Sequence, residues 1–153
     1  MNTFIFGGSG YIGNVVSNKL SRFTNITNLD NQIYNNQYYP YFELPNYREL
    51  ILDIRKFTEF KTSFQDIDTL LVLGGLVGDP ITKKYPDESI QINEESIIRM
   101  LDQAINSKIK NIIFISTCSN YGLMRKGQIA DENTNLNPLS LYAKSKVKIE
   151  NLL

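Results

Sequence analysis

The feature that most constrains this chain is a glycine-rich turn that follows its first apolar run. Residues 4–6 are apolar, and the next seven read Gly7-Gly8-Ser9-Gly10-Tyr11-Ile12-Gly13. Apolar residues at helical spacing follow, at positions 12, 15, 16 and 20. Strand, glycine turn and helix in this order are typical of a dinucleotide-binding turn, in which a pyrophosphate lies at the positive end of the helix dipole. Two registers fit, Gly8-x-Gly10-x-x-Gly13 and Gly7-x-x-Gly10-x-x-Gly13.

Length and charge indicate one ordinary globular domain. The chain has 153 residues, of which 42% are hydrophobic and 21% charged, and its formal net charge is +0. Without a basic field, we expect neither a nucleic-acid partner nor an anionic membrane as partner. No signal peptide or membrane span is visible, and the lone Cys118 permits no internal disulfide. A reducing, cytoplasmic location is therefore expected.

The absence of histidine restricts the chemistry. With no histidine in the chain, Ser-His-Asp and Cys-His nucleophilic schemes are excluded. Most zinc sites are excluded as well, and we expect no metal site. Any proton transfer must therefore use Tyr, Lys, Asp, Glu or a hydroxyl relay.

Strands and helices are predicted to alternate along the chain. The expected strands are residues 3–7, 26–30, 48–53, 68–74 and 111–116, and the expected helices are residues 11–22, 57–64, 87–107 and 140–153. Asp87, after Pro86, is expected to cap the long helix. Loops are expected at residues 31–46, 74–80 and 122–138. This pattern predicts an α/β fold with a doubly wound parallel sheet (a Rossmann fold) in the order 3-2-1-4-5, with its ligand crevice at the carboxyl ends of the strands.

Two acids end predicted strands. Asp30 ends the second strand, at the distance from Gly10 where a dinucleotide fold places an acid for the ribose hydroxyls. A carboxylate would repel a 2′-phosphate, so NAD is favoured over NADP as cofactor. Asp53 ends the third strand and would face the adenine. The alternatives are a turn residue for Asp30 and a helix cap for Asp53.

Two further sites of interest lie later in the chain. Gly74 and Gly75 end the fourth strand, where small residues permit close approach of the cofactor. Tyr142 and Lys146 are at positions i and i+4 of the last helix and share one face. A lysine ammonium and a cationic nicotinamide would together lower the pKa of the tyrosine from near 10 towards about 7. A hydroxyl from Ser116-Thr117 could then relay a substrate proton to that tyrosine.

Taken together, these residues resemble the extended short-chain dehydrogenase/reductases, the NAD-dependent nucleotide-sugar epimerases and dehydratases. The resemblance rests on motifs that run in order along nearly the whole chain: Gly7-Gly8-Ser9-Gly10-Tyr11-Ile12-Gly13, Leu29-Asp30-Asn31, Asp53-Ile54, Gly74-Gly75, Val77-Gly78-Asp79-Pro80, Ile92-Asn93, Ser116-Thr117-Cys118-Ser119-Asn120-Tyr121-Gly122 and Tyr142-Ala143-Lys144-Ser145-Lys146.

The resemblance implies a role for each candidate residue. The pyrophosphate would be held by Gly7, Gly10 and Gly13 with the Tyr11 and Ile12 amides, which makes Gly8 a bystander. The remaining cofactor contacts would come from Asp30, Asn31, Asp53, Ile54, Gly74, Gly75, Asn93, Ser116, Tyr142 and Lys146. Tyr142 would be the catalytic base, with Lys146 tuning it and Thr117 in the catalytic Ser/Thr position. In a 4-epimerase of this kind, the sugar is oxidised transiently by hydride transfer to NAD⁺ and then reduced on its other face.

Three departures from the family pattern matter. Dehydratases carry Asp-Glu after the catalytic threonine, whereas this chain has Cys118-Ser119, which argues against a dehydratase. Many members end the fourth strand in Ala-Ala rather than Gly74-Gly75. The family is also usually about twice this length, with a sixth strand and a substrate domain, so residues 1–153 are expected to be an incomplete NAD-binding Rossmann domain.

Three functions remain open from sequence. The first is an NAD-dependent epimerase acting on a small molecule, a nucleotide sugar. The second is a non-catalytic NAD-binding or sensing module, and the third is a reductase of the same fold acting on another carbonyl. In this family the long and last helices often form a dimer interface, so a homodimer is one expectation, although the last helix is cut short.

Overall fold

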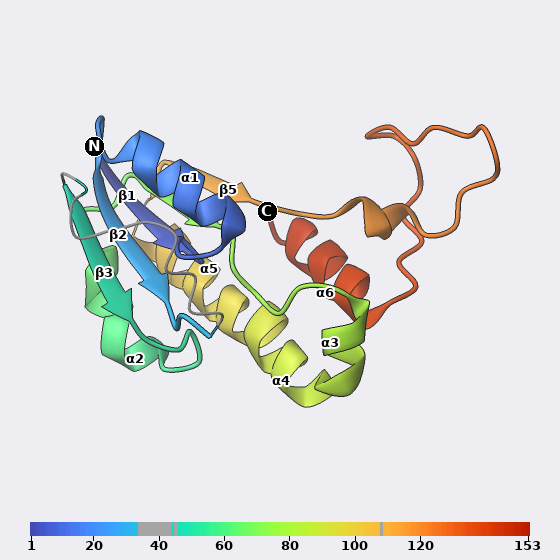
Figure 1. Ribbon diagram of the computed structural model, residues 1–153, viewed down its shortest axis with the longest axis horizontal. Coiled ribbons are helices and arrows are strands. Elements are labelled where there is room, and N and C mark those ends of the chain that lie inside the picture. The colour runs from blue at the N-terminus through green and yellow to red at the C-terminus, as the bar shows by residue number, and fades with distance from the viewer. Residues whose placement is uncertain (34–43, 45, 108) are drawn as a thin grey trace. The chain divides into compact units, whose positions relative to one another are not determined.

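The sheet has the predicted topology. The computed structural model describes residues 1–33, 44, 46–107 and 109–153. Its five strands are all parallel and lie in the order β3-β2-β1-β4-β5 (Figure 1). The strands are β1 (Asn2–Phe6), β2 (Asn25–Asp30), β3 (Tyr47–Ile51), β4 (Thr69–Val72) and β5 (Asn111–Phe114). The predicted Rossmann fold and strand order are therefore confirmed.

Helical segments connect the strands, and the described chain divides into two compact units. The helical segments are α1 (Tyr11–Leu20), α2 (Phe57–Phe60), η2 (Lys61–Phe64), α3 (Asp79–Lys84), α4 (Pro86–Ile90), η3 (Gln91–Ser96), α5 (Ile97–Asn106), η4 (Cys118–Tyr121) and α6 (Leu141–Glu150). The first unit comprises Met1–Gly75 and Ile98–Ile115, and the second comprises Leu76–Ile97 and Ser116–Leu153.

Both faces of the central strand β1 are covered within the first unit. Side chains alternate across a strand, so Phe4 and Ile5 point to opposite faces. Phe4 stacks on Phe64 of η2 with ring centroids 4.5 Å apart. Ile5 belongs to the cluster that packs against Leu20 of α1. Figure 1 accordingly shows α1 on one face of the sheet and α2 with α5 on the other.

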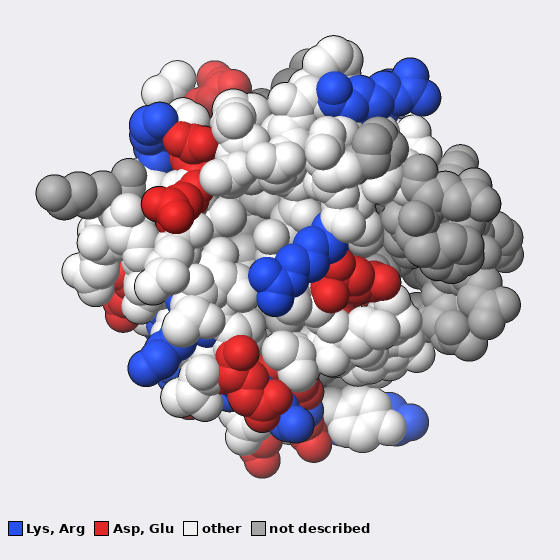
Figure 2. All heavy atoms as spheres, turned by 90° about the vertical axis from the view of Figure 1, so that its left-hand side faces the viewer, with Lys and Arg blue, Asp and Glu red and all other residues white. Residues whose placement is uncertain are grey.

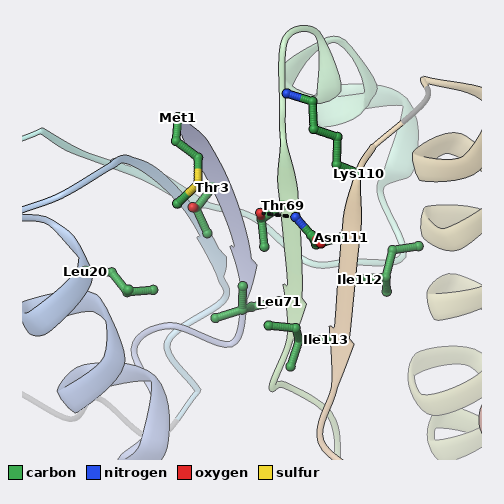
Figure 3. A pocket seen from close by; sticks show the side chains of 9 residues that line it. All are labelled: Met1, Thr3, Leu20, Thr69, Leu71, Lys110, Asn111, Ile112 and Ile113. Carbon is green, nitrogen blue, oxygen red and sulfur yellow. Dashed lines mark hydrogen bonds between the residues drawn. The ribbon is translucent and has the colours of Figure 1, made fainter.

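A shallow hollow lies on the α1 side of the sheet, over β1, β4 and β5 (Figure 3). It is lined by Met1, Thr3, Leu20, Thr69, Leu71, Lys110, Asn111, Ile112 and Ile113. Met1 and Lys110 directly precede β1 and β5, so the hollow opens at the amino ends of the strands. Ligands of doubly wound sheets bind beyond the carboxyl ends, so this hollow is not the predicted nucleotide crevice.

The second unit is built around α6. This helix packs against the π-helical segment η3, against α3 and against η4. Ser140 caps it, because its hydroxyl oxygen accepts a hydrogen bond from the backbone N–H of Ala143 at 3.2 Å. The predicted start of the last helix is therefore confirmed. Its end is earlier than predicted, at Glu150 rather than at Leu153.

Other boundaries also differ from the predictions. The expected loop 74–80 ends in a helix, since α3 begins at Asp79 after Gly78 with φ at 93°. The expected long helix is three segments, of which η3 has π-helical hydrogen bonds. Asp87 does not cap it: Tyr85 is the N-cap residue and Asp87 lies in the first turn. Most of the expected loop 31–46 lies outside the described residues.

The surface carries mixed charge on the face that Figure 2 presents. Acidic and basic side chains are interspersed there, in keeping with the formal net charge of +0. Among the described residues, no helix is long and apolar enough to cross a membrane.

Candidate functional site

The glycine turn is built by close backbone packing. Gly7 has φ at +87°, a conformation that other residues rarely adopt. A Cβ on Gly7 would lie 2.4 Å from the Cα of Gly74, so the turn lies directly against the end of β4. A Cβ on Gly13 would lie 2.3 Å from the carbonyl oxygen of Gly7. The turn therefore requires glycine at positions 7 and 13 for packing alone.

Gly8 is not a bystander, contrary to the sequence interpretation. Its backbone N–H donates to Oδ1 of Asn28 at 2.8 Å. A Cβ on Gly8 would lie 2.3 Å from that same oxygen. The chain thus satisfies both glycine registers, with Gly8 needed for contact with the second strand.

The first turn of α1 is suited to hold an anion. Gly10 is its N-cap residue, and no described side chain caps the helix there. The first turn also contains no acidic residue. Tyr11 is 91% exposed and Ile12 48% exposed, and the backbone N–H groups of a first helical turn have no partner within the helix. Unsatisfied N–H groups and the helix dipole together fit the pyrophosphate of a dinucleotide.

Asp30 lies beside this turn, as predicted. Its Oδ2 accepts a hydrogen bond from the Ser9 N–H at 3.0 Å, and its Oδ1 accepts one from the Gln32 N–H at 2.8 Å. Burial raises the pKa of Asp30 above its ordinary value, and these hydrogen bonds partly oppose the shift. The first unit therefore brings together the glycine turn and the acid that sequence reasoning assigned to the ribose.

Sequence reasoning missed the polar side chains that lie behind the turn. Asn28 is fully buried, and its Nδ2 donates to the hydroxyl groups of Ser9 and Tyr47. Ser9 in turn donates to Glu49 of β3 at 2.9 Å. The available signal was an asparagine inside an otherwise apolar strand, since a buried amide must find partners.

The adenine candidates behave differently from one another. Asp53 accepts hydrogen bonds from the Arg55 backbone and guanidinium, which hold the pKa of its carboxyl below the ordinary value. It does not cap α2, whose N-cap residue is Lys56. Ile54 is 3% exposed and belongs to the buried core. Asn31, a candidate for the adenosine ribose, accepts a hydrogen bond from the Ile33 N–H at 3.3 Å.

In the second unit, Asn93 holds the segment that follows β4. Its Oδ1 accepts from the Leu76 N–H and its Nδ2 donates to the Leu76 carbonyl, both at 2.8 Å. Asn93 is buried within η3, as the sequence placed it in the long helix. This paired contact fixes the chain directly after Gly75, whose φ of 142° also favours glycine.

Tyr142 and Lys146 lie together on α6. The Lys146 Nζ is 5.7 Å from the centroid of the Tyr142 ring, which confirms the predicted shared face. Burial lowers the pKa of Lys146 to about 8. Burial, and then the negative charge of Asp79, raise the pKa of Tyr142. The sequence argument lowered the pKa of Tyr142 through two cations, Lys146 and a bound nicotinamide, and did not include desolvation.

The hydroxyl candidates lie just beyond β5. Thr117 is the N-cap residue of η4, and its hydroxyl oxygen accepts from the Ser119 N–H at 3.2 Å. Ser116 accepts from Nδ2 of the buried Asn120 at 3.0 Å, and the same Nδ2 donates to Glu150 of α6. Asn120 therefore ties this segment to the helix that carries Tyr142.

Glu94 is a second residue that sequence reasoning missed. It is 8% exposed and accepts hydrogen bonds from Ser145 at 2.8 Å and from Lys148 at 2.5 Å. Both partners are on α6, so Glu94 fixes this helix to η3. In the sequence, Glu94 is a single acid within the apolar stripe of the predicted helix. From sequence alone, the simpler interpretation of such an acid is a solvent-exposed position.

The depressed pKa of Lys146 predicts how stability depends on pH. The unfolded lysine keeps its proton up to about pH 10.5, whereas the folded one loses it near pH 8. Because the unfolded chain then binds more protons, the free energy of unfolding should rise by about 1–2 kcal/mol between about pH 7.5 and 9.5. Urea denaturation of the wild type and of Lys146→Met measures this, since only the wild type should show the rise.

Lys144→Met is the matched control, because Lys144 is an exposed lysine on the same helix. Its stability should follow the pH dependence of the wild type. A wild-type profile parallel to that of Lys146→Met over this range would contradict the assignment.

Among the residues that the structure describes, no group of three or more acids and cysteines is placed to hold a metal ion.

Comparison with known proteins agrees with this architecture. Residues 3–153 match the profile of the NAD dependent epimerase/dehydratase family. The chain is 29% identical over 154 residues to an N-acetyl-alpha-D-glucosaminyl-diphospho-ditrans,octacis-undecaprenol 4-epimerase of Escherichia coli O157:H7. That alignment covers 99% of this chain and 42% of the relative. The chain thus spans about half the length of the relatives it matches.

Solved structures give the same result. A UDP-N-acetylglucosamine 4-epimerase from Methanobrevibacter ruminantium M1, solved with UDP-N-acetylmuramic acid, matches with a TM-score of 0.88 at 25% identity, over 99% of this chain and 48% of that one. A UDP-glucose 4-epimerase from Thermus thermophilus, solved with NAD, shares the fold with a TM-score of 0.84 at 22% identity, over 99% of this chain and 49% of that one. The chain belongs to the NAD dependent epimerase/dehydratase family.

Proposed function

We propose that this chain is the cofactor-binding part of an NAD-dependent nucleotide-sugar epimerase. The observation that carries the proposal is the Tyr142–Lys146 pair, with the ammonium 5.7 Å from the ring centroid. A module that only bound the nucleotide would need the glycine turn and Asp30 but not this pair. Relatives whose names describe 4-epimerases support the same class of reaction.

The first unit would bind the nucleotide. The N–H groups at the start of α1 would hold the pyrophosphate, and Asp30 would accept hydrogen bonds from the adenosine ribose hydroxyls. The exposed, uncapped helix end and the orientation of Asp30 by Ser9 and Gln32 fit that role. Asn31, Asp53 and the backbone of Ile54 would complete the adenosine end.

The second unit would supply the residues that transfer the substrate proton. NAD⁺, when bound, supplies a reversible hydride acceptor for a sugar carbon. Tyr142 would remove the proton of the sugar hydroxyl at that carbon and return it after the keto sugar has turned over. Thr117 would hold the same oxygen. Lys146, protonated below about pH 8, would favour the phenolate form of Tyr142 and hold a ribose hydroxyl.

The side chains after Thr117 favour epimerisation over elimination. Cys118 and Ser119 occupy the positions where the dehydratases of the family carry Asp-Glu. Both are exposed, and neither is an acid that could take part in loss of water. A cytoplasmic location and assembly into a homodimer also belong to this proposal.

Nucleotide binding tests the proposal directly in this chain. At about 1 mM NAD, and with a Kd ten- to a hundredfold lower, the thermal midpoint should rise by about 3–8 °C. Asp30→Asn should reduce this rise, because the ribose loses its ionic hydrogen-bond acceptor. Differential scanning fluorimetry measures both.

Asp66→Asn provides the control, since Asp66 is an exposed acid in the turn before β4 and should leave the rise intact. A midpoint that NAD does not move in the wild type would overturn the proposed function.

A further inference from the structure

Two carboxylates at the glycine turn share the same two donor residues. Asp30 accepts the backbone N–H groups of Ser9 and Gln32, at 3.0 and 2.8 Å. Glu49 accepts the side chains of the same two residues through Oε1, at 2.9 Å from the Ser9 hydroxyl and 2.8 Å from the Gln32 amide. Each carboxylate is therefore held within hydrogen-bonding distance of Ser9, a residue of the turn itself.

The sheet register brings Glu49 to this place. In the parallel pair β2–β3, Glu49 lies opposite Asn28, two residues before the position opposite Asp30. Residues two apart on a strand share a face, so Asn28, Asp30 and Glu49 all project from the same side of the sheet. Glu49 lies outside the motifs that carry the family resemblance.

Hydrogen-bond polarity fixes Glu49 as an acceptor. The Ser9 hydroxyl oxygen already accepts a bond from Nδ2 of Asn28 at 3.0 Å, and Asn28 is held in that orientation by the Gly8 N–H. The single hydroxyl proton of Ser9 is thus left to donate to Glu49. Gln32 also contacts Glu49 through an amide N–H, so both partners present donors to a carboxylate.

The two acids place negative charge beside the turn. In the described ranges of the chain, neither Asp30 nor Glu49 forms a salt bridge with a lysine or arginine. After burial, the nearby Glu49 charge is itself one of the causes that raise the pKa of Asp30. The field at this end of the turn is therefore that of two carboxylates, where the sequence motif predicted one.

We propose that Glu49 is a second specificity-determining residue of the nucleotide site and acts with Asp30 to exclude dinucleotides that carry a 2′-phosphate. The inference rests on the proposed function, because it takes the glycine turn as the dinucleotide site. NAD and NADP differ only by a phosphate at the ribose hydroxyl that Asp30 would bind. A second fixed carboxylate adds Coulomb repulsion against that group and leaves the uncharged hydroxyl of NAD unaffected.

The test is the affinity of this chain for both dinucleotides in Glu49→Gln. The glutamine carbonyl can accept the bonds that Oε1 accepts now, so the change removes charge and keeps shape. Isothermal titration with NAD and with NADP should show the ratio Kd(NADP)/Kd(NAD) fall by about tenfold, with Kd(NAD) changed less than about threefold. General damage to the turn would weaken both ligands and leave the ratio unchanged.

Glu59→Gln is the matched control. Glu59 is an exposed acid of α2 in the same unit, and its removal should leave the ratio at the wild-type value. If Glu49→Gln does not fold, Glu49→Ala removes the same charge and should move the ratio in the same direction.

The outcomes separate the two claims. If the wild type binds NAD and folded Glu49→Gln has an unchanged ratio Kd(NADP)/Kd(NAD), the role of Glu49 is overturned and the proposed function is not. A wild type that binds neither dinucleotide overturns the proposed function and this inference with it.

Discussion

Gly13→Ala should destabilise the chain by about 3 kcal/mol or more and abolish nucleotide binding. The new Cβ would lie 2.3 Å from the Gly7 carbonyl oxygen and 2.5 Å from the Gly8 Cα. Both are backbone atoms of the turn, so no side chain can move aside to relieve the overlap. Overpacking of well-packed sites costs about 1–3 kcal/mol, and a backbone clash belongs at the upper end or beyond it. Urea denaturation measures the loss.

Gly10→Ala separates packing from ligand binding at the same turn. Its Cβ would meet only the Gly7 carbonyl oxygen, at 3.3 Å, and φ is −77°. We therefore expect stability within about 1 kcal/mol of the wild type, with weaker NAD binding because the methyl group projects at the anion-binding end of α1. If Gly13→Ala is as stable as the wild type, the backbone of the turn must be able to move away from position 13. That result would contradict the packing argument.

Tyr142→Phe should lower kcat by about 10²- to 10⁴-fold in a chain extended to the length of its relatives. That is the usual contribution of a positioned general acid or base. The hydroxyl of Tyr142 is the only group removed, and the ring that lies near Lys146 stays in place. The Kd for NAD should change little, so steady-state turnover together with titration of NAD measures the effect.

Tyr85→Phe is the control of the same chemical kind, because Tyr85 is an exposed tyrosine in the same unit. It should turn over at the wild-type rate. If Tyr142→Phe also keeps that rate, Tyr142 is not the catalytic base, whereas an extended chain without measurable turnover would favour the non-catalytic NAD-binding module.

Secondary-structure alternation carried most of the fold prediction. Apolar runs of strand length separated by helical periodicity leave few topologies, since crossovers between parallel strands are right-handed and sequential strands tend to be neighbours. The order β3-β2-β1-β4-β5 then followed from the doubly wound pattern of dinucleotide-binding folds. Glycines were also informative, because Gly7 and Gly13 meet steric demands that no other residue can satisfy.

The side-chain hydrogen-bond networks could not be predicted from the sequence. Asn28 and Glu94 are each buried by partners more than 15 positions away, and nothing local in the chain marks those pairings. The desolvation that raises the pKa of Tyr142 was missed for a related reason. Desolvation depends on the tertiary environment, which the spacing of residues along the chain does not reveal.

The π-helical turn Gln91–Ser96 has a consequence for how this segment can change. A π turn holds one residue more than an α turn, so adjacent side chains are splayed by a smaller angle. Two consecutive residues there are hydrogen-bonded to different parts of the second unit: Asn93 to Leu76, and Glu94 to Ser145 of α6. Loss or gain of one residue would rotate Asn93 and Glu94 together, away from the groups to which they are hydrogen-bonded. The segment should therefore accept substitutions at its outward positions far more readily than any change in its length.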